Sequence, residues 1–87
     1  MTTLTRDAAL ALYRITCLAV EDGLPATMVR DNLLDYHGIT ALDTATPAQI
    51  AALLSTLRRA RHYEPPSEVV LHVIAVNHAT LRDEPLR

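Results

Sequence analysis

The amino-acid sequence predicts an all-α fold, a compact bundle of about four helices joined by short connections. Apolar residues make up 49% of the chain, yet its only aromatic residues are three tyrosines, so the core must consist of Leu, Ala, Val and Ile. Apolar residues recur at the spacing of a helix face, and capping residues, glycines and prolines divide the chain into four such segments. Because the chain has 87 residues, we expect a single domain over residues 1–87.

The first helix is predicted over residues 6–22. Thr5 precedes it as an N-cap, Asp7 supplies the negative charge favoured in a first turn, and Gly23 suits the left-handed position after the last turn. Its apolar arc is wider than one neighbouring helix can cover, so it is either central in the domain or faces another subunit. The predicted arc consists of Ala8, Ala9, Ala11, Leu12, Tyr13, Ile15, Ala19 and Val20.

The second helix is predicted over residues 25–37. Pro25 suits a first helical position, where a missing N–H costs nothing, and Gly38 suits the residue after the end. The expected inward stripe is Ala26, Val29, Leu33 and Tyr36.

The third helix is predicted over residues 47–62, on the clearest local signal in the chain. Thr46 can cap it, Pro47 can open it, and the Gln49 side chain can reach back to the cap. The helix ends in basic residues, the sign that suits a C-terminus, and Pro65 with Pro66 prevents its continuation.

The last segment allows two readings. Residues 69–76 are rich in β-branched side chains, which favours a strand, but apolar and polar residues do not alternate and no partner strand is evident. Ser67 can cap a helix with Glu68 in its first turn. We therefore predict a helix over residues 67–82 and keep a strand over 69–76 as the alternative.

Composition excludes several kinds of function. The chain has no lysine, two glycines and one cysteine, which excludes a Walker-type loop, a Schiff-base lysine, a glycine-rich nucleotide cradle and a cysteine zinc cluster. No two histidines show the four-residue spacing of a helical metal site. Cys17 lies in the middle of a predicted helix, and no nearby base is evident that could activate its thiol. We therefore expect no enzyme, no cofactor and no metal. No apolar run is long enough to span a membrane, so we expect a cytoplasmic protein.

A basic cluster at the end of the third helix is the candidate partner-binding site. It comprises Arg58, Arg59, Arg61, His62 and Tyr63. Arginines of this kind can grip an acidic surface of another protein, although they also compensate the helix dipole.

A second reading of the chain is a dimeric helix-turn-helix regulator of transcription. The residues that resemble this pattern are Ala19, Gly23, Leu24 and Val29. The second helix would then read DNA through Thr27, Arg30 and Asp31. The chain carries little positive charge for phosphate contacts, and an ordinary helical corner explains the same residues.

Self-association is also expected, because a small core is marginally stable and a dimer is a common remedy. The broad face of the first helix and the valine-rich last segment are the candidates for a two-fold contact. The possible dimer face comprises Tyr13, Val20, Val73 and Val76.

Residues 11–57, about half of the chain, resemble the N-terminal part of the GemA-type regulatory proteins of Mu-like phages. The residues that carry the resemblance are Leu24, Val29, Arg30, Leu33, Leu34, the stop at Gly38, and Ile50, Leu54 and Leu57 in the Thr-led helix. Members of that family are longer and more basic, and the segment from Pro65 has no counterpart in them. The resemblance implies a small accessory protein of a phage or other mobile element. Such proteins, anti-CRISPR inhibitors among them, commonly dock on host machinery, so we expect a non-enzymatic regulator or inhibitor that binds a host protein.

Overall fold

The computed structural model describes residues 3–80, and within that range it contains α-helices and no strand. The elements are α1 (Arg6–Asp22), α2 (Ala26–Tyr36), α3 (Pro47–Ala60), α4 (Glu68–Asn77) and the short 3-10 helix η1 (His78–Thr80). The predicted all-α class is confirmed, and residues 69–76 are helical.

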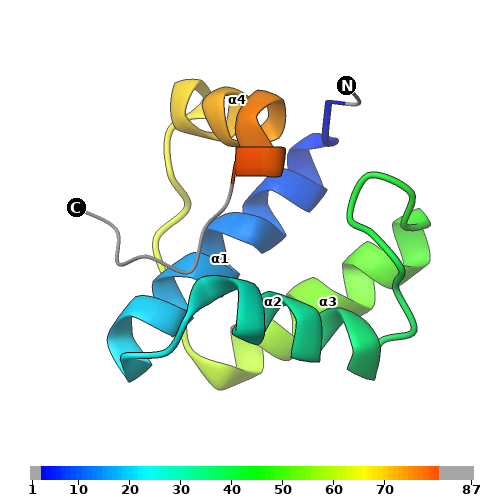
Figure 1. Ribbon diagram of the computed structural model, residues 1–87. Coiled ribbons are helices and arrows are strands. Elements are labelled where there is room, and N and C mark those ends of the chain that lie inside the picture. Colours follow the sequence, from blue (N-terminus) through cyan, green and yellow to red (C-terminus); the bar gives the residue numbers. More distant parts are fainter. Residues whose placement is uncertain (1–2, 81–87) are drawn as a thin grey trace.

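Helix α1 is the centre of the fold, and each of the other three α-helices packs against it (Figure 1). Its buried side includes Ala8, Ala9 and Ala11, whose small side chains let the neighbouring helices approach closely. Ile15, Leu53 and the other fully buried side chains complete the core. The broad apolar arc of α1 is therefore used mainly inside the domain.

The helix starts follow the predicted capping chemistry. The Thr5 hydroxyl accepts a hydrogen bond from the Ala8 amide at 3.2 Å. At α3, Thr46 and Gln49 form a reciprocal capping box, with N–H to oxygen distances of 2.9 and 3.1 Å. Gly23 adopts the expected left-handed conformation, with φ of 66°. These local bonds fix where α1 and α3 begin and where α1 ends.

Helices α2, α3 and α4 are shorter than predicted. Pro25 is the N-cap of α2 in an extended conformation, and His37 is its C-cap, so neither belongs to the helix. Helix α3 stops at Ala60 because Arg61 is extended, with φ of −163° and ψ of 144°. The predicted start at 25 and the predicted end at 37 are therefore each wrong by one residue, and the predicted end at 62 is wrong by two.

Helix α4 begins after Ser67 as predicted, with the Ser67 hydroxyl accepting from the Val70 amide. It ends at Asn77 and tightens into η1, which ends at Thr80. The predicted residues 81 and 82 of this helix lie outside the described part of the chain. The amide of Leu4 donates to the carbonyl of Ala75 at 3.1 Å, so the N-terminal segment satisfies a carbonyl near the end of α4.

The inward stripe of α2 differs from the predicted one at Tyr36, which is 80% exposed. Leu34 is buried instead, because the chain folds back after Gly38. There the Ile39 amide donates to the Leu34 carbonyl at 2.8 Å, and the Ile39 side chain is buried too. Gly38 takes the left-handed conformation after the last turn of α2, and the chain that follows it packs back on the helix. This determines which side of α2 faces the core.

Candidate functional site

The outer side of α4 carries four of the eight large apolar residues that are exposed in the described part of the chain. Val69, Val70, Val73 and Val76, which we call the valine face, are 74%, 42%, 52% and 40% exposed. Residues 69, 73 and 76 are four and three positions apart, so their side chains form one ridge along the helix. Exposed apolar patches of this kind mark surfaces that contact other molecules.

The core contact of α4 explains why the valines remain outside. Leu71 and Ala75 are buried, at 2% and 5% exposure. They lie on the side of α4 that packs against α1. A helix that is apolar all round is expected in the middle of a domain, but α4 lies at its periphery (Figure 1). Its second apolar side therefore has no neighbour within residues 3–80.

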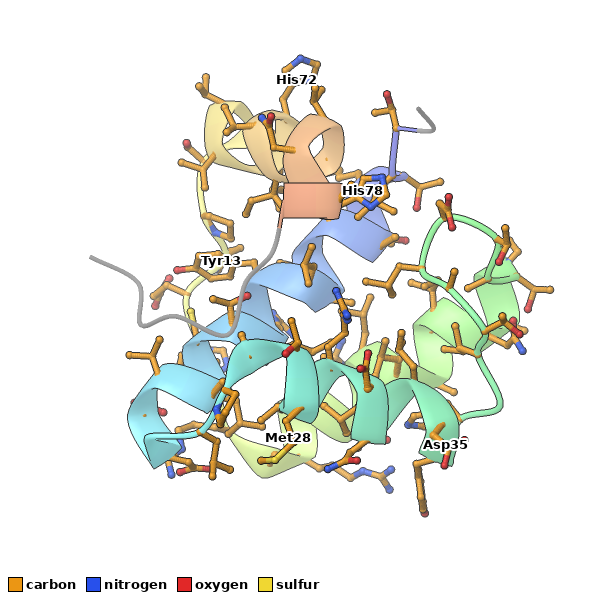
Figure 2. All side chains as sticks on the ribbon, in the orientation of Figure 1. Tyr13, Met28, Asp35, His72 and His78 are labelled. Carbon is orange, nitrogen blue, oxygen red and sulfur yellow. The ribbon has the colours of Figure 1, made fainter. Side chains whose placement is uncertain are left out.

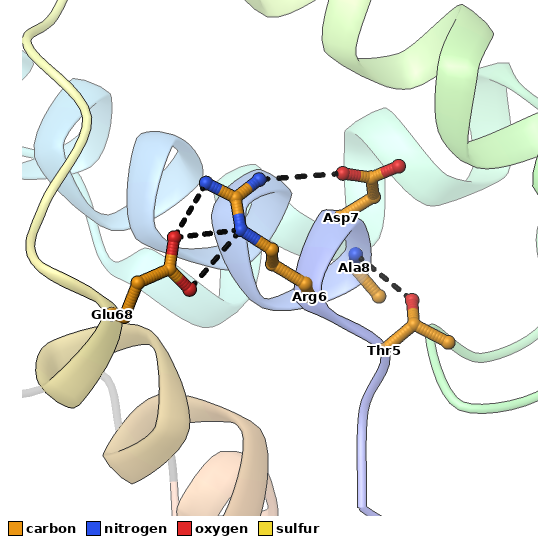
Figure 3. A network of polar contacts seen from close by, with 5 residues as sticks. All are labelled: Thr5, Arg6, Asp7, Ala8 and Glu68. Carbon is orange, nitrogen blue, oxygen red and sulfur yellow. Dashed lines mark hydrogen bonds and ion pairs between the residues drawn. The ribbon is translucent and has the colours of Figure 1, made fainter.

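The valine face carries no charge along its middle. At its start, the Arg6 Nε atom donates to the Glu68 carboxylate at 2.9 Å, and an Arg6 Nη atom lies 2.8 Å from the same group (Figure 3). The hydrogen bond from Arg6 lowers the pKa of Glu68. Near its end, the side-chain Nδ2 of Asn77 donates to the Val73 carbonyl at 2.9 Å. His72, beside the ridge, projects outward (Figure 2).

Burial of the valine face against a partner would contribute favourable free energy to binding. The four exposures together amount to about two whole valine residues. Complete burial of one such side chain contributes about 1.5–3 kcal/mol, so the face offers roughly 3–6 kcal/mol before the costs of association.

The predicted basic cluster is divided in the structure. Arg61 and Tyr63 are bound to Glu21 near the end of α1: Arg61 Nη1 lies 3.2 Å from the Glu21 carboxylate, and the Tyr63 hydroxyl donates to the same oxygen. Burial, together with the hydrogen bond to Glu21, raises the pKa of Tyr63 to about 12. Arg58 and Arg59 are exposed and have no side-chain partner in the described range.

His62, the remaining member of the basic cluster, is exposed. The cluster lies at the end of α3, and the connection over residues 61–67 separates it from α4 (Figure 1). Arg58, Arg59 and His62 are therefore the members of the cluster that have no competing side-chain partner in the described range.

The DNA-reading hypothesis gains no support from the orientation of α2. The exposed residues of α2 are Met28, Asp31, Asn32, Asp35 and Tyr36. This surface carries two carboxylates and no cation, so it repels phosphates. Thr27 is half-buried, and Arg30 turns its Nε atom to Asp31, at 3.0 Å.

The four residues of the expected dimer face do not form one surface. Val73 and Val76 belong to α4, at the top of Figure 1, whereas Val20 lies near the end of α1 at the lower left. Tyr13 is half-buried, and its hydrogen bond with Cys17 raises its pKa. The sequence prediction also left out Val69 and Val70. The β-branched run of the last segment was the signal that could have included them.

Among residues 3–80, no group of three His, Cys, Asp or Glu side chains is arranged to hold a metal ion. The helices between residues 3 and 80 include none with the length and hydropathy of a membrane-spanning segment. The His37 ring is hydrogen-bonded to the Thr56 hydroxyl at 2.9 Å, so it links the end of α2 to α3.

Comparisons of the chain with protein-family models, curated proteins and solved structures gave no match.

Proposed function

We propose that the protein is a small non-enzymatic regulator or inhibitor that acts by binding another protein through the valine face of α4. The observation that carries the proposal is the exposure of four valines on one ten-residue helix. The ridge of Val69, Val73 and Val76 suits an apolar groove between helices, because residues at this spacing interlock with the side-chain rows of a facing helix.

The partner that we propose is a host protein in the cytoplasm. This part of the proposal rests on the resemblance of residues 11–57 to GemA-type phage regulators, and it is an analogy. In this view the chain is an accessory protein of a phage or other mobile element, of the same general type as anti-CRISPR proteins. Arg58 and Arg59 would add polar contacts only to a partner large enough to reach the end of α3.

Two matched substitutions test the proposal. Val73→Arg places a charge in the middle of the valine face, while Val20→Arg makes the same change near the end of α1. The two valines are 52% and 53% exposed, so both variants should fold equally well. Circular dichroism and thermal unfolding would check this. The wild type and both variants are then used to capture proteins from a host lysate.

The proposal expects a defined host protein that the wild type and Val20→Arg retain and Val73→Arg loses. Binding of the purified partner should weaken at least tenfold on Val73→Arg, which corresponds to about 1.4 kcal/mol. Equal capture by all three proteins would refute it. Sedimentation of the free chain covers the alternative of a second copy: a dimer that only Val73→Arg dissociates would assign the face to self-association instead.

A further inference from the structure

The two flanks of the valine face differ in chemistry. Successive residues of an α-helix are about 100° apart, so Val73 lies opposite the buried side of α4. Val69 and Val76 lie about 40° and 60° to one side of Val73. Val70 lies about 60° to the other side, and Ile74 follows at about 100°. The valine face therefore has one flank beyond Val69 and Val76 and another beyond Val70.

The flank beyond Val69 and Val76 is polar. His72 on this flank is exposed and projects outward (Figure 2). Glu68 lies one turn earlier, and the Arg6 Nε atom donates to its two carboxylate oxygens at 2.9 and 3.1 Å (Figure 3). More than half of each side chain of this ion pair is in contact with water. Burial of the pair against an apolar partner would cost desolvation free energy, so this flank suits the edge of an interface.

The flank beyond Val70 is apolar. Ile74 is half-buried and packs against the core of the domain, so apolar surface continues from the valine face towards the core. The polar residue on this side is Asn77, which is uncharged, ends α4 and binds the Val73 carbonyl through its side-chain Nδ2. A partner can therefore cover this flank without removing a charge from water, and the burial of Val70 favours binding.

The apolar arc is also wider than contact with one helix requires. A seam of two apolar positions in seven residues is enough for one facing helix, and the ridge of the valine face already supplies it. Val70 and Ile74 widen the arc to about 160°, which is typical of a helix with more than one neighbour.

We propose that the partner contacts α4 through two helices, one along the ridge and one beside Val70 and Ile74, and leaves the flank with His72 in water. The second helix of the partner is uncharged where it meets Val70, because no charged side chain of α4 lies on that flank. The inference rests on the proposed function, since it concerns the same surface.

Matched substitutions on the two sides of Val73 test the inference. Val70→Arg and His72→Arg each place an arginine at an exposed position of α4, the first on the apolar flank and the second on the polar flank. The probe is the purified host protein that the wild type and Val20→Arg retain and Val73→Arg loses. Circular dichroism and thermal unfolding check the folding of each variant, and isothermal titration calorimetry measures its affinity for the probe.

Val70→Arg should weaken binding of the probe by at least about tenfold, and His72→Arg should change it by less than about twofold. Val70→Thr, which keeps the shape of the side chain and adds a hydroxyl, is a second variant that should also weaken binding. Full affinity of both Val70 variants would show that one helix covers the ridge alone, and the inference would be wrong. An equal loss in Val70→Arg and His72→Arg would overturn it too.

These outcomes separate the inference from the proposed function. If Val73→Arg loses the probe and the Val70 variants do not, the valine face remains the binding surface and only the two-helix contact is rejected. If no host protein distinguishes Val73→Arg from the wild type, the proposed function and this inference fail together.

Discussion

The contacts of Glu21 hold the connection between α3 and α4 against the end of α1. Glu21 accepts a hydrogen bond from the Tyr63 hydroxyl and lies 3.2 Å from Arg61 Nη1. We call these three residues the Glu21 cluster. Tyr63→Phe keeps the ring and removes the hydroxyl, and Glu21→Ala removes the acceptor in a residue type that favours helices. Together the two changes isolate one bond across 42 positions of sequence.

The expected size of this bond is about 1 kcal/mol. A hydrogen bond to a charged group contributes about 1.5–3 kcal/mol, but solvent and the neighbouring Arg61 screen this partly exposed one. In Tyr63→Phe the carboxylate keeps Arg61 as a partner, so no buried charge is left alone. For a domain of this size, a loss of about 1 kcal/mol lowers the melting temperature by about 4–8 °C.

Urea unfolding of the wild type, both single variants and the double variant gives the coupling energy directly. We expect about 1 kcal/mol between Tyr63 and Glu21. The control is Tyr36→Phe, because Tyr36 is 80% exposed and its hydroxyl has no partner in the described range. It should change stability by less than about 0.5 kcal/mol. A coupling energy of zero would show that the cluster does not stabilise the fold and would refute this reasoning.

The Tyr63 hydroxyl also predicts a specific pH dependence. Its pKa is about 12 in the folded chain and about 10 in an unfolded one. Below pH 10 both states are protonated, and the stabilisation is fully present. Above pH 10 the unfolded chain loses the proton first, so stability falls until pH reaches about 12. The stability difference between wild type and Tyr63→Phe should therefore shrink between pH 10 and 12. No lysine obscures this window.

Three further substitutions test other parts of the fold. Leu53→Ala should destabilise by about 3 kcal/mol in urea unfolding, because Leu53 is wholly buried and its removal leaves a cavity; a loss below 1 kcal/mol would mean that the core collapses around it. Thr46→Ala should cost about 1 kcal/mol, since it removes the capping bond to the Gln49 amide; Ala48→Ser serves as the control. The pKa of Glu68, measured by magnetic resonance titration, should lie below its ordinary value and return to it in Arg6→Gln; a Glu68 pKa that Arg6→Gln leaves unchanged would contradict the ion pair.

The parts of the fold that the sequence predicts are those controlled by neighbouring residues. The caps at Thr5, Thr46 and Ser67 and the left-handed end at Gly23 each depend on side chains or backbone within a few positions. The position of Tyr36 depends instead on how Ile39 folds back over Leu34. Such a contact is decided by packing, which the spacing of apolar residues describes only on average.

The Glu21 cluster shows why the basic site was only partly predictable. Five basic or aromatic residues close together in sequence look like one surface, but Glu21, 40 positions before Arg61, binds two of them within the fold. The sequence of a group of charged surface residues does not show which distant residue of the same chain will pair with them. Prediction of such a site requires the tertiary structure, because opposite charges that meet across a fold carry no local signal.

The last helix poses the opposite problem, because apolar residues lie both on its core side and on much of its outer side, and its polar residues are only Glu68, His72 and Asn77. A segment with this pattern has two possible structures: a helix or strand surrounded by other elements, or a peripheral helix with one uncovered side. Only the place of α4 beside α1 distinguishes them, and it leaves Val69 and Val73 exposed. Valine has a low helix propensity, so these residues are not there to form the helix. Exposed valines lower the stability of the helix and the solubility of the protein. A partner that covers them would explain their presence, and for this reason the valine face carries the functional proposal.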